Sequence, residues 1–365
     1  MAGARIPLND LGRHCGALAD VLAPTVRRVM ERGWYVLGPE NADFEARFAS
    51  YCGTEHAIGV ANGTDAIELA LRAAGVAPGD RVATVANAGF YTTAALTAIC
   101  AAPLFVDVDA DTQLVAGEAL SSALDNPVRA VVVTHLYGRL ADVETIVDLC
   151  AERSIPVIED CAQAHGANRG GRRAGSFGLA GCFSFYPTKN LGAIGDGGAI
   201  VTNDDAFAAS VRSLRQYGWS GKYHVCQPGG RNSRLDEVQA AVLAAKLSFL
   251  DGWNARRRDI AQRYTASICD PRITCPKVTG EDYVAHLYVI RTDDRDDLRR
   301  HLEKCGIASE IHYPVPDHRQ PCMTDEAMAE LPVTERCANE VLTLPCFPEM
   351  SDAEVERVID AVNSW

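Results

Sequence analysis

The stretch His56-Ala-Ile-Gly-Val-Ala-Asn-Gly-Thr-Asp-Ala66 decides the fold class, because a short apolar strand runs there directly into a helix. Farther along the chain, short apolar runs keep alternating with helical stretches. The expected strands are 56–60, 81–85, 103–107, 129–134 and 155–159, and the helices between them include 65–74, 92–100 and 142–153. Continuous apolar strands that alternate with helices are typical of a mostly parallel sheet covered on both faces. We therefore predict an α/β fold.

The remaining chain predicts two domains of unequal size. Strands 181–185 and 198–202 flank a glycine-rich turn, and helices 17–33 and 41–52 precede the first strand. Beyond Arg234 we expect helices 235–250 and 253–268, a strand 284–290, a helix 294–305, the loop Tyr313-Pro-Val-Pro316 and terminal helices. We place a large domain at 1–250 and a smaller α/β domain at 251–365. A sheet of this kind binds ligands beyond the carboxyl ends of its strands.

Composition excludes several classes of protein. The 365 residues carry a net charge of −13, which argues against a nucleic-acid partner. No apolar run approaches the roughly 20 residues that span a bilayer, and Met1-Ala-Gly-Ala-Arg-Ile-Pro7 lacks the apolar segment of a secretory signal. The thirteen cysteines are scattered, without zinc-site spacing. We expect a cytoplasmic protein that has no membrane partner and no metal.

One lysine stands between an apolar strand and a glycine-rich turn, in Ser184-Phe-Tyr-Pro-Thr-Lys189-Asn-Leu-Gly192. Apolar neighbours at the mouth of a sheet desolvate an ammonium group and lower its pKa, and a neutral amine is the nucleophile that forms Schiff bases. We interpret Lys189 as the lysine that holds pyridoxal 5′-phosphate (PLP). The alternative is a solvated surface lysine.

Two carboxylates, in Ile158-Glu159-Asp160, stand at the end of the expected strand 155–159. PLP chemistry needs an aspartate against the pyridine nitrogen, since a negative charge there keeps the nitrogen protonated. Asp160 is our candidate, and Glu159 then points to the opposite side of the strand because side chains alternate. The alternative is that either carboxylate caps a turn.

The sequence offers a phosphate site and a ring partner. Gly63 and Thr64 open a helix, where free amides bind anions, although Thr64 or Asn62 acting as an ordinary helix cap explains the motif equally well. The Ser184 hydroxyl, on the strand before the lysine turn, is a further phosphate candidate. Phe90 is the candidate for stacking on the cofactor ring, with Tyr91 as its competitor and a core role as the alternative for both.

In order along the chain, four motifs resemble the DegT/DnrJ/StrS family of PLP-dependent nucleotide-sugar aminotransferases, which have the aspartate aminotransferase fold (fold type I PLP enzymes). They are Asn62-Gly-Thr-Asp-Ala66, Glu159-Asp-Cys-Ala-Gln-Ala-His165, Phe183-Ser-Phe-Tyr-Pro-Thr-Lys189 and Asn232-Ser-Arg-Leu-Asp-Glu237. The resemblance implies that Lys189 forms the Schiff base, Asp160 pairs with the ring nitrogen and Gln163 bonds the ring hydroxyl. It implies phosphate binding by Gly63, Thr64, Ser184 and the neighbouring subunit's copy of Asn232, and hence a homodimer with shared active sites. Gly89-Phe90 and Ala86 depart from the family pattern around the stacking residue.

The resemblance also indicates a reaction. Position 189 is lysine and not the histidine of related dehydratases, which favours transamination from an amino acid, L-glutamate being expected. Tyr186-Pro-Thr-Lys-Asn-Leu-Gly192 resembles the 3-aminotransferases of TDP-3-keto-6-deoxyhexoses. A 4-keto sugar, a UDP-linked sugar, a keto-inositol and a non-catalytic regulatory or partner protein remain alternatives.

The resemblance also implies the substrate residues Tyr186, Lys222, Tyr223, His312 and Tyr313. For His312 and Tyr313 a proline-stiffened packing loop is the alternative. Arg215 and Arg231 are expected to join Lys222 as cations for a diphosphate. A further expectation concerns the helix after Arg234, whose apolar face packs either on a two-fold mate or inside the chain itself. Its residues are Leu235, Val238, Ala241, Val242 and Ala245.

Overall fold

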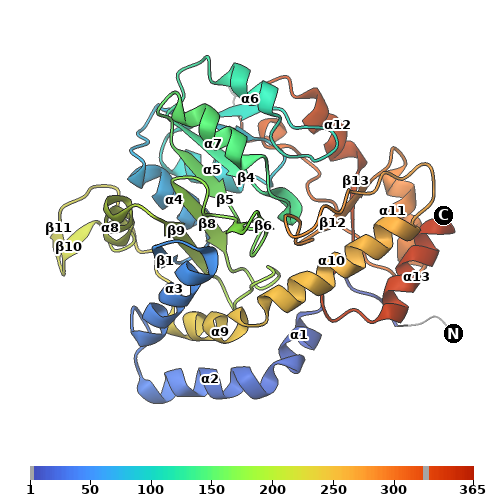
Figure 1. The fold of residues 1–365 in the computed structure, drawn as a ribbon, viewed down its shortest axis with the longest axis horizontal. Helices are drawn as coiled ribbons and strands as arrows, with labels where there is room; N and C mark the ends of the chain where they lie inside the picture. The colour runs from blue at the N-terminus through green and yellow to red at the C-terminus, as the bar shows by residue number, and fades with distance from the viewer. Residues whose placement is uncertain (1–3, 324–328) are drawn as a thin grey trace.

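A seven-stranded sheet forms the centre of the computed structural model, which describes residues 4–323 and 329–365 (Figure 1). The strand order is β1-β9-β8-β5-β4-β2-β3. The strands are β1 His56–Val60, β2 Arg81–Val85, β3 Ala102–Val106, β4 Ala130–Thr134, β5 Val157–Asp160, β8 Ala180–Ser184 and β9 Gly198–Thr202. Only β9 pairs antiparallel, with β1 and β8, and the other pairings are parallel. The predicted mostly parallel sheet is confirmed.

Helices cover both faces of this sheet. One face carries α4 Gly63–Ala73, α5 Tyr91–Ala98 and α8 Asp205–Leu214, while the other carries α3 Pro39–Cys52, α6 Gly117–Ala123, α7 Val143–Ala151 and α9 Glu237–Leu247. The alternation of side chains along β4 explains the two layers. Val132 packs toward α4 and α5, whereas Val131 and Val133 pack toward α6 and α7. All five residues of this strand are buried, as a strand covered on both faces requires.

The expected helix 17–33 is two helices, α1 Leu11–Ala17 and α2 Ala19–Arg32, separated at Leu18. Leu18 and Leu22 pack against Val242 of α9. Leu235 lies before α9, and Leu235, Ala241 and Val242 are all buried within the chain, while Val238 and Ala245 are only partly exposed. The intrachain alternative therefore accounts for most of this apolar face.

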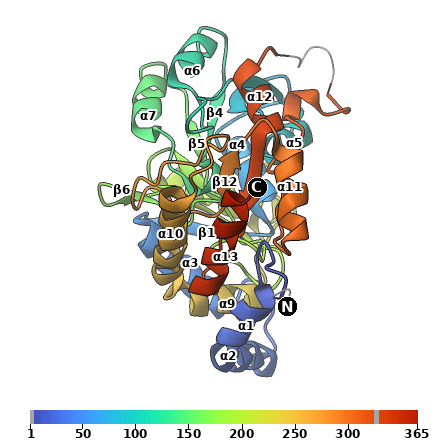
Figure 2. The same cartoon turned by 90° about the vertical axis from the view of Figure 1, so that its right-hand side faces the viewer.

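The C-terminal part builds a second core beside the sheet domain (Figure 2). Its elements are α10 Leu250–Ser267, β12 Tyr288–Arg291, α11 Arg295–Lys304, η2 Asp317–Arg319, α12 Pro332–Glu340, β13 Val341–Leu344 and α13 Asp352–Asn363. The strand expected at 284–290 begins only at Tyr288, because Ala285 has a φ of 45° and interrupts the extended run. Ile6 joins this core through a bridge to Ile307, so the first described residues lie against the C-terminal part.

Small elements complete the fold. They are η1 Leu136–Gly138, the hairpin β6 Asn168–Arg169 with β7 Arg172–Arg173, and the hairpin β10 Trp219–Gly221 with β11 His224–Val225. The β10–β11 hairpin projects from the edge of the molecule, at the left of Figure 1. None of the helices in the described ranges is long and apolar enough to cross a membrane.

Candidate active site

A cavity of about 790 Å³ opens at the carboxyl ends of β5 and β8 and at the start of α4. This is the edge of the sheet where ligands of parallel α/β folds bind. Nine of the residues predicted from the sequence line it: Gly63, Thr64, Asp160, Gln163, Ser184, Tyr186, Lys189, His312 and Tyr313. Phe90, Lys222, Tyr223 and Asn232 are not among the lining residues.

Lys189 lies in the turn that follows β8, and its backbone N–H donates to the Tyr186 carbonyl at 2.8 Å. Burial lowers the pKa of Lys189 to about 8, although the charge of Asp160 opposes the shift. Near pH 8 about half of the amine is then neutral and nucleophilic. A second lysine stabilises this turn: the buried Lys246 of α9 donates from Nζ to the Gly192 carbonyl at 2.8 Å.

Asp160 ends β5 on the face that carries α4, which is also the cavity side. Its side chain is 5% exposed, and Oδ1 accepts one hydrogen bond, from the Ala162 N–H at 3.1 Å. Burial raises the pKa of Asp160, while that N–H and the charge of Lys189 oppose the rise. A buried carboxylate with so few donors favours a cationic partner in the cavity.

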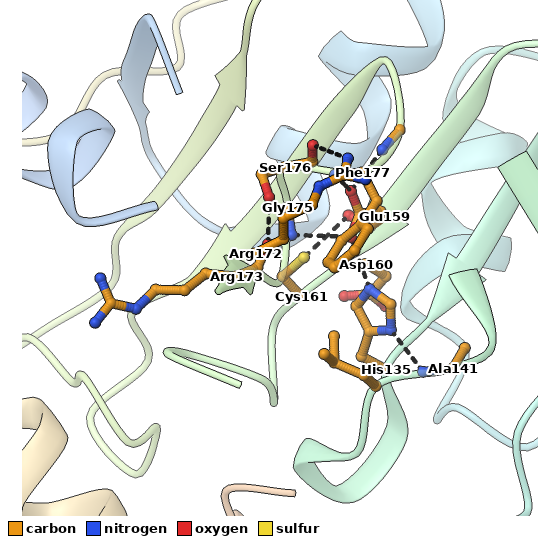
Figure 3. A network of polar contacts seen from close by, with 12 residues as sticks. His135, Ala141, Glu159, Asp160, Cys161, Arg172, Arg173, Gly175, Ser176 and Phe177 are labelled. Atoms are coloured by element: carbon orange, nitrogen blue, oxygen red, sulfur yellow. Dashed lines mark hydrogen bonds and ion pairs between the residues drawn. The ribbon is translucent and has the colours of Figure 1, made fainter. Parts of the chain in front are cut away.

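Glu159 points to the other side of β5, as predicted, and every lone pair of its carboxylate has a donor (Figure 3). Oε1 accepts from the N–H groups of Phe177 at 2.7 Å and Gly178 at 2.8 Å. Oε2 accepts from the Gly175 N–H and from His135 Nε2, both at 2.9 Å. Because His135 Nδ1 accepts from the Ala141 N–H at 3.1 Å, Nε2 carries the proton.

Glu159, His135 and Cys161 have ligand atoms within 4.8 Å of one another, a spacing that could suit a metal ion. Both ring nitrogens of His135 and both oxygens of Glu159 are already committed to hydrogen bonds within the chain. This cluster is therefore a structural network that ties β5 to neighbouring loops.

The start of α4 forms a second wall of the cavity. The Asn62 side chain accepts from the Asp65 N–H at 2.8 Å, so Asn62 and not Thr64 is the cap of this helix. A Cβ on Gly63 would lie 2.7 Å from the Ser184 Cβ, so only glycine lets β8 approach this closely. The amides at the first turn and the Ser184 hydroxyl consequently meet in one place, which suits a phosphate group.

Of the two aromatics considered for the cofactor ring, Tyr91, the competitor, lines the cavity, and Phe90 is not among the lining residues. Phe90 is the N-cap of α5 in the left-handed conformation, and its N–H donates to Asp317 Oδ1 at 2.9 Å. This tether fixes the turn, and Tyr91 follows it at the cavity. Its ring lies edge-on to Tyr313, with ring centroids 6.3 Å apart.

Gln163 connects three walls of the site. Its Oε1 accepts from the Tyr137 N–H at 2.6 Å, and its Nε2 donates to the Tyr313 hydroxyl at 3.1 Å. The Tyr137 hydroxyl in turn donates to the His312 carbonyl at 2.5 Å, and His312 Nδ1 contacts the Thr343 hydroxyl at 2.8 Å. His312 and Tyr313 thus pack the loop and also line the cavity.

Lys222 and Tyr223 lie on the projecting hairpin, where the Lys222 ammonium sits 5.1 Å from the Tyr223 ring centroid. The Tyr223 side chain is 78% exposed. Asn232 is also exposed, and its backbone bridges to Gln216 near this hairpin. None of these three residues lines the cavity of its own chain.

The expectation that Arg215 and Arg231 supply cations for a diphosphate is wrong for this chain. Arg215 is buried and donates to the Gly59 carbonyl at 2.8 Å while paired with Glu45. Arg231 pairs with two acidic residues of α4, Asp65 and Glu68. Both guanidinium groups are therefore neutralised within the chain.

Sequence reasoning missed a group of lining residues that come from distant segments: Leu8, Asn9, His286, Leu287, Thr343, Leu344 and Cys346. His286 falls inside the run that was expected to be a strand, where a histidine carries no separate signal. Leu8 and Asn9 precede all the motifs and reach the cavity only because the N-terminal segment packs on the C-terminal core.

The residues in the cavity fit PLP. The partly neutral Lys189, the sparsely bonded Asp160 and the close approach of Gly63 to Ser184 provide an amine, an anion and an anion-binding end. These are the three groups that an aldehyde, a protonated ring nitrogen and a phosphate require.

Comparison with known proteins agrees with this fit. The DegT/DnrJ/EryC1/StrS aminotransferase family profile matches residues 18–363. Over 365 residues the chain is 42% identical to a dTDP-3-amino-3,4,6-trideoxy-alpha-D-glucose transaminase of Streptomyces venezuelae, covering 99% of this chain and 96% of the relative. It is 44% identical over 361 residues to a dTDP-3-amino-3,6-dideoxy-alpha-D-galactopyranose transaminase of Aneurinibacillus thermoaerophilus, covering 99% of each chain.

The crystal structure of S. venezuelae DesV in complex with a ketimine intermediate superimposes with a TM-score of 0.96 at 42% identity, over 100% of this chain and 99% of that one. The predicted fold and enzyme class are confirmed, and PLP is the cofactor. The chain belongs to the DegT/DnrJ/EryC1/StrS aminotransferase family.

Proposed function

We propose that this chain transfers an amino group from L-glutamate to the C3 ketone of a dTDP-linked 3-keto-6-deoxyhexose. The observation that carries the proposal is that Lys189 and Asp160 line one cavity of about 790 Å³, which has room for a sugar beside the cofactor. Two relatives that match nearly the whole chain are named as transaminases of dTDP-3-amino sugars, which supports C3 over C4.

When bound, PLP supplies an electron sink that stabilises negative charge at the carbon that gains or loses the amino group. Lys189 holds the cofactor covalently and, once released, moves a proton between carbon atoms. Its pKa of about 8 suits it to act as acid and as base. The Asp160 carboxylate binds the ring nitrogen and keeps it protonated.

The other lining residues orient the cofactor. The first-turn amides of Gly63 and Thr64, with the Ser184 hydroxyl, bind the phosphate. Gln163 lies at hydrogen-bonding distance from Tyr313 and is assigned to the ring hydroxyl, as the resemblance implied. Tyr91 is assigned to the ring face in place of Phe90, because of these two candidates only Tyr91 lines the cavity.

The working unit in this proposal is a homodimer whose active sites are shared. Asn232 reaches the phosphate of the neighbouring site, and Lys222 with Tyr223 reaches the diphosphate and sugar there, while Tyr186, His312 and Tyr313 contact the sugar from within the chain. The exposure of Asn232 and of the hairpin, away from their own cavity, supports this assignment. Mixing inactive Lys189→Ala chains with inactive Asn232→Ala chains should restore about a quarter of the activity when subunits exchange at random. No recovery after proven exchange contradicts shared sites.

The setting and the domain division are also proposals. All thirteen cysteines are free, which supports a reducing, cytoplasmic compartment. A separate hydrophobic core built from α10, β12, α11, β13 and α13 supports a division near 250, where α10 begins.

The decisive test supplies holoprotein with L-glutamate and a panel of ketones, and locates the new amine by NMR. The panel contains dTDP-3-keto and dTDP-4-keto hexoses, a UDP-linked ketone and a keto-inositol. We expect amination at C3 of the dTDP sugar. Amination at C4, or of the cyclitol alone, contradicts the substrate assignment. A PLP-loaded protein that shows no spectral change with any amino donor favours the non-catalytic alternative.

A further inference from the structure

One histidine in the cavity wall has no role in the mechanism above. His286 precedes β12 and lines the cavity beside Leu287. It is only 7% exposed, so its ring is held in one orientation by its surroundings. A buried polar ring at a ligand cavity raises the question of which nitrogen it offers to the ligand.

The side-chain amide of Asn190, next to His286, has its orientation fixed by hydrogen bonds to backbone carbonyls and to Asn254. Asn254 Nδ2 donates to the His165 carbonyl at 2.8 Å, which leaves Asn254 Oδ1 as an acceptor. Asn190 Nδ2 donates to that oxygen at 2.9 Å and to the Val284 carbonyl at 3.2 Å. Since a carbonyl can only accept, Asn190 must present its own Oδ1 in the remaining direction.

That direction is occupied by His286. Its Nδ1 lies 3.0 Å from Asn190 Oδ1 and therefore carries the proton. Among the described residues, Nε2 has no hydrogen-bond partner. Burial lowers the pKa of His286 well below its usual value, and the charge of Lys189 adds to the effect. The ring is neutral and presents a lone pair on Nε2.

We propose that His286 Nε2 accepts a hydrogen bond from a hydroxyl group of the sugar substrate and so acts as a specificity residue. The inference rests on the proposed function. A fixed acceptor rejects other acceptors, and the ketone, the carboxylates of glutamate and the cofactor phosphate are all acceptors. The sugar hydroxyls can donate as well as accept, so they are the groups of the sugar that complement Nε2.

The test separates the two nitrogens with two substitutions. His286→Asn keeps an N–H near the position of Nδ1 for Asn190 but removes the cavity acceptor. His286→Gln places an amide oxygen near the position of Nε2. For the keto sugar, kcat/KM should fall about 10- to 100-fold in His286→Asn, because the substrate hydroxyl loses its partner. His286→Gln should recover part of this loss.

Two readouts distinguish this role from a structural one. The half-reaction with L-glutamate, followed by the cofactor absorbance, should change less than about twofold in both variants, since no sugar is present. The affinity for dTDP-6-deoxyhexose should fall in His286→Asn, whereas the affinity for dTDP, which lacks the sugar, should not.

Equal losses in both half-reactions, or an unchanged kcat/KM in His286→Asn, overturn the role of His286. The proposed function still stands in that case if the wild type aminates the keto sugar. A wild-type protein that aminates no keto sugar and binds dTDP-6-deoxyhexose no better than dTDP overturns the proposed function and this assignment together.

Discussion

Glu159 and Asp160 are neighbours on β5. Each has a carboxylate side chain, but the two carboxylates have different surroundings. Glu159 receives four hydrogen bonds from Gly175, Phe177, Gly178 and His135. Asp160 receives one, from the Ala162 N–H, and faces the cavity. Both are buried, and they lie on opposite faces of the sheet because side chains alternate along a strand.

The difference separates a structural carboxylate from a functional one. A carboxylate whose lone pairs all accept hydrogen bonds within the chain stabilises the fold and has no free acceptor site for a ligand. A buried charge with few donors costs folding free energy until a ligand supplies its partner. The cavity side of β5 accordingly also holds Lys189, whose pKa is lowered, and His286, whose Nε2 has no partner among the described residues.

The largest expected effect is on the cavity side. Lys189→Ala should lower turnover at least about 10³-fold, because the group that moves the proton is gone. The variant should still fold and bind PLP noncovalently, which retained cofactor after gel filtration would check. Full activity in this variant would contradict the assignment of the lysine.

The other face of β5 should respond in stability. Glu159→Gln replaces one oxygen with an NH₂ group and leaves two donors facing it, at a cost of about 2 to 6 kcal/mol in unfolding free energy. Asp160→Asn is the matched control and should cost little, because burial already disfavours the ionised form. Denaturant unfolding of both apoproteins measures the contrast, and equal losses would break the comparison.

A third carboxylate tests the same reasoning through pH. Asp317 is buried and accepts from the Phe90 N–H at 2.9 Å and the Thr93 hydroxyl at 2.5 Å. Burial raises its pKa from 3.8 to about 6, so the folded state binds a proton more tightly than the unfolded state. Stability should therefore fall, by up to about 3 kcal/mol, as pH rises between about 4 and 6. Asp317→Asn should flatten this decline in denaturant titrations, and an unchanged slope would contradict the account.

A smaller effect is expected at the helix start beside the cavity. Gly63→Ala places a methyl group 2.7 Å from the Ser184 Cβ and should cost about 1 to 3 kcal/mol and weaken PLP binding. Gly117 is the control, since it also begins a helix but has no atom within 4 Å of an added Cβ. Thermal melts and PLP titrations compare Gly63→Ala with Gly117→Ala. Equal effects of the two substitutions would contradict a role for the close approach of Gly63 to Ser184.

Sequence patterns predicted what depends on neighbouring residues. The strands of the sheet, the turn that carries Lys189 and the opposite directions of Glu159 and Asp160 all follow from local periodicity. Contacts between distant segments decided the rest. The turn at Phe90 is tethered through its N–H to Asp317, 227 residues away, and Arg215 is neutralised by Glu45, 170 residues away. Neither partner leaves a signal near the residue that it redirects.

The most direct test of the contrast between the two faces is a single-turnover reaction of holoprotein with L-glutamate, followed by the absorbance of the lysine-bound cofactor. Wild type and Glu159→Gln, the latter kept well below its melting temperature, should lose this absorbance at similar rates. Asp160→Asn should react at least about 10²-fold more slowly, because the ring nitrogen loses the charge that keeps it protonated. An Asp160→Asn protein that reacts as fast as the wild type would contradict the account.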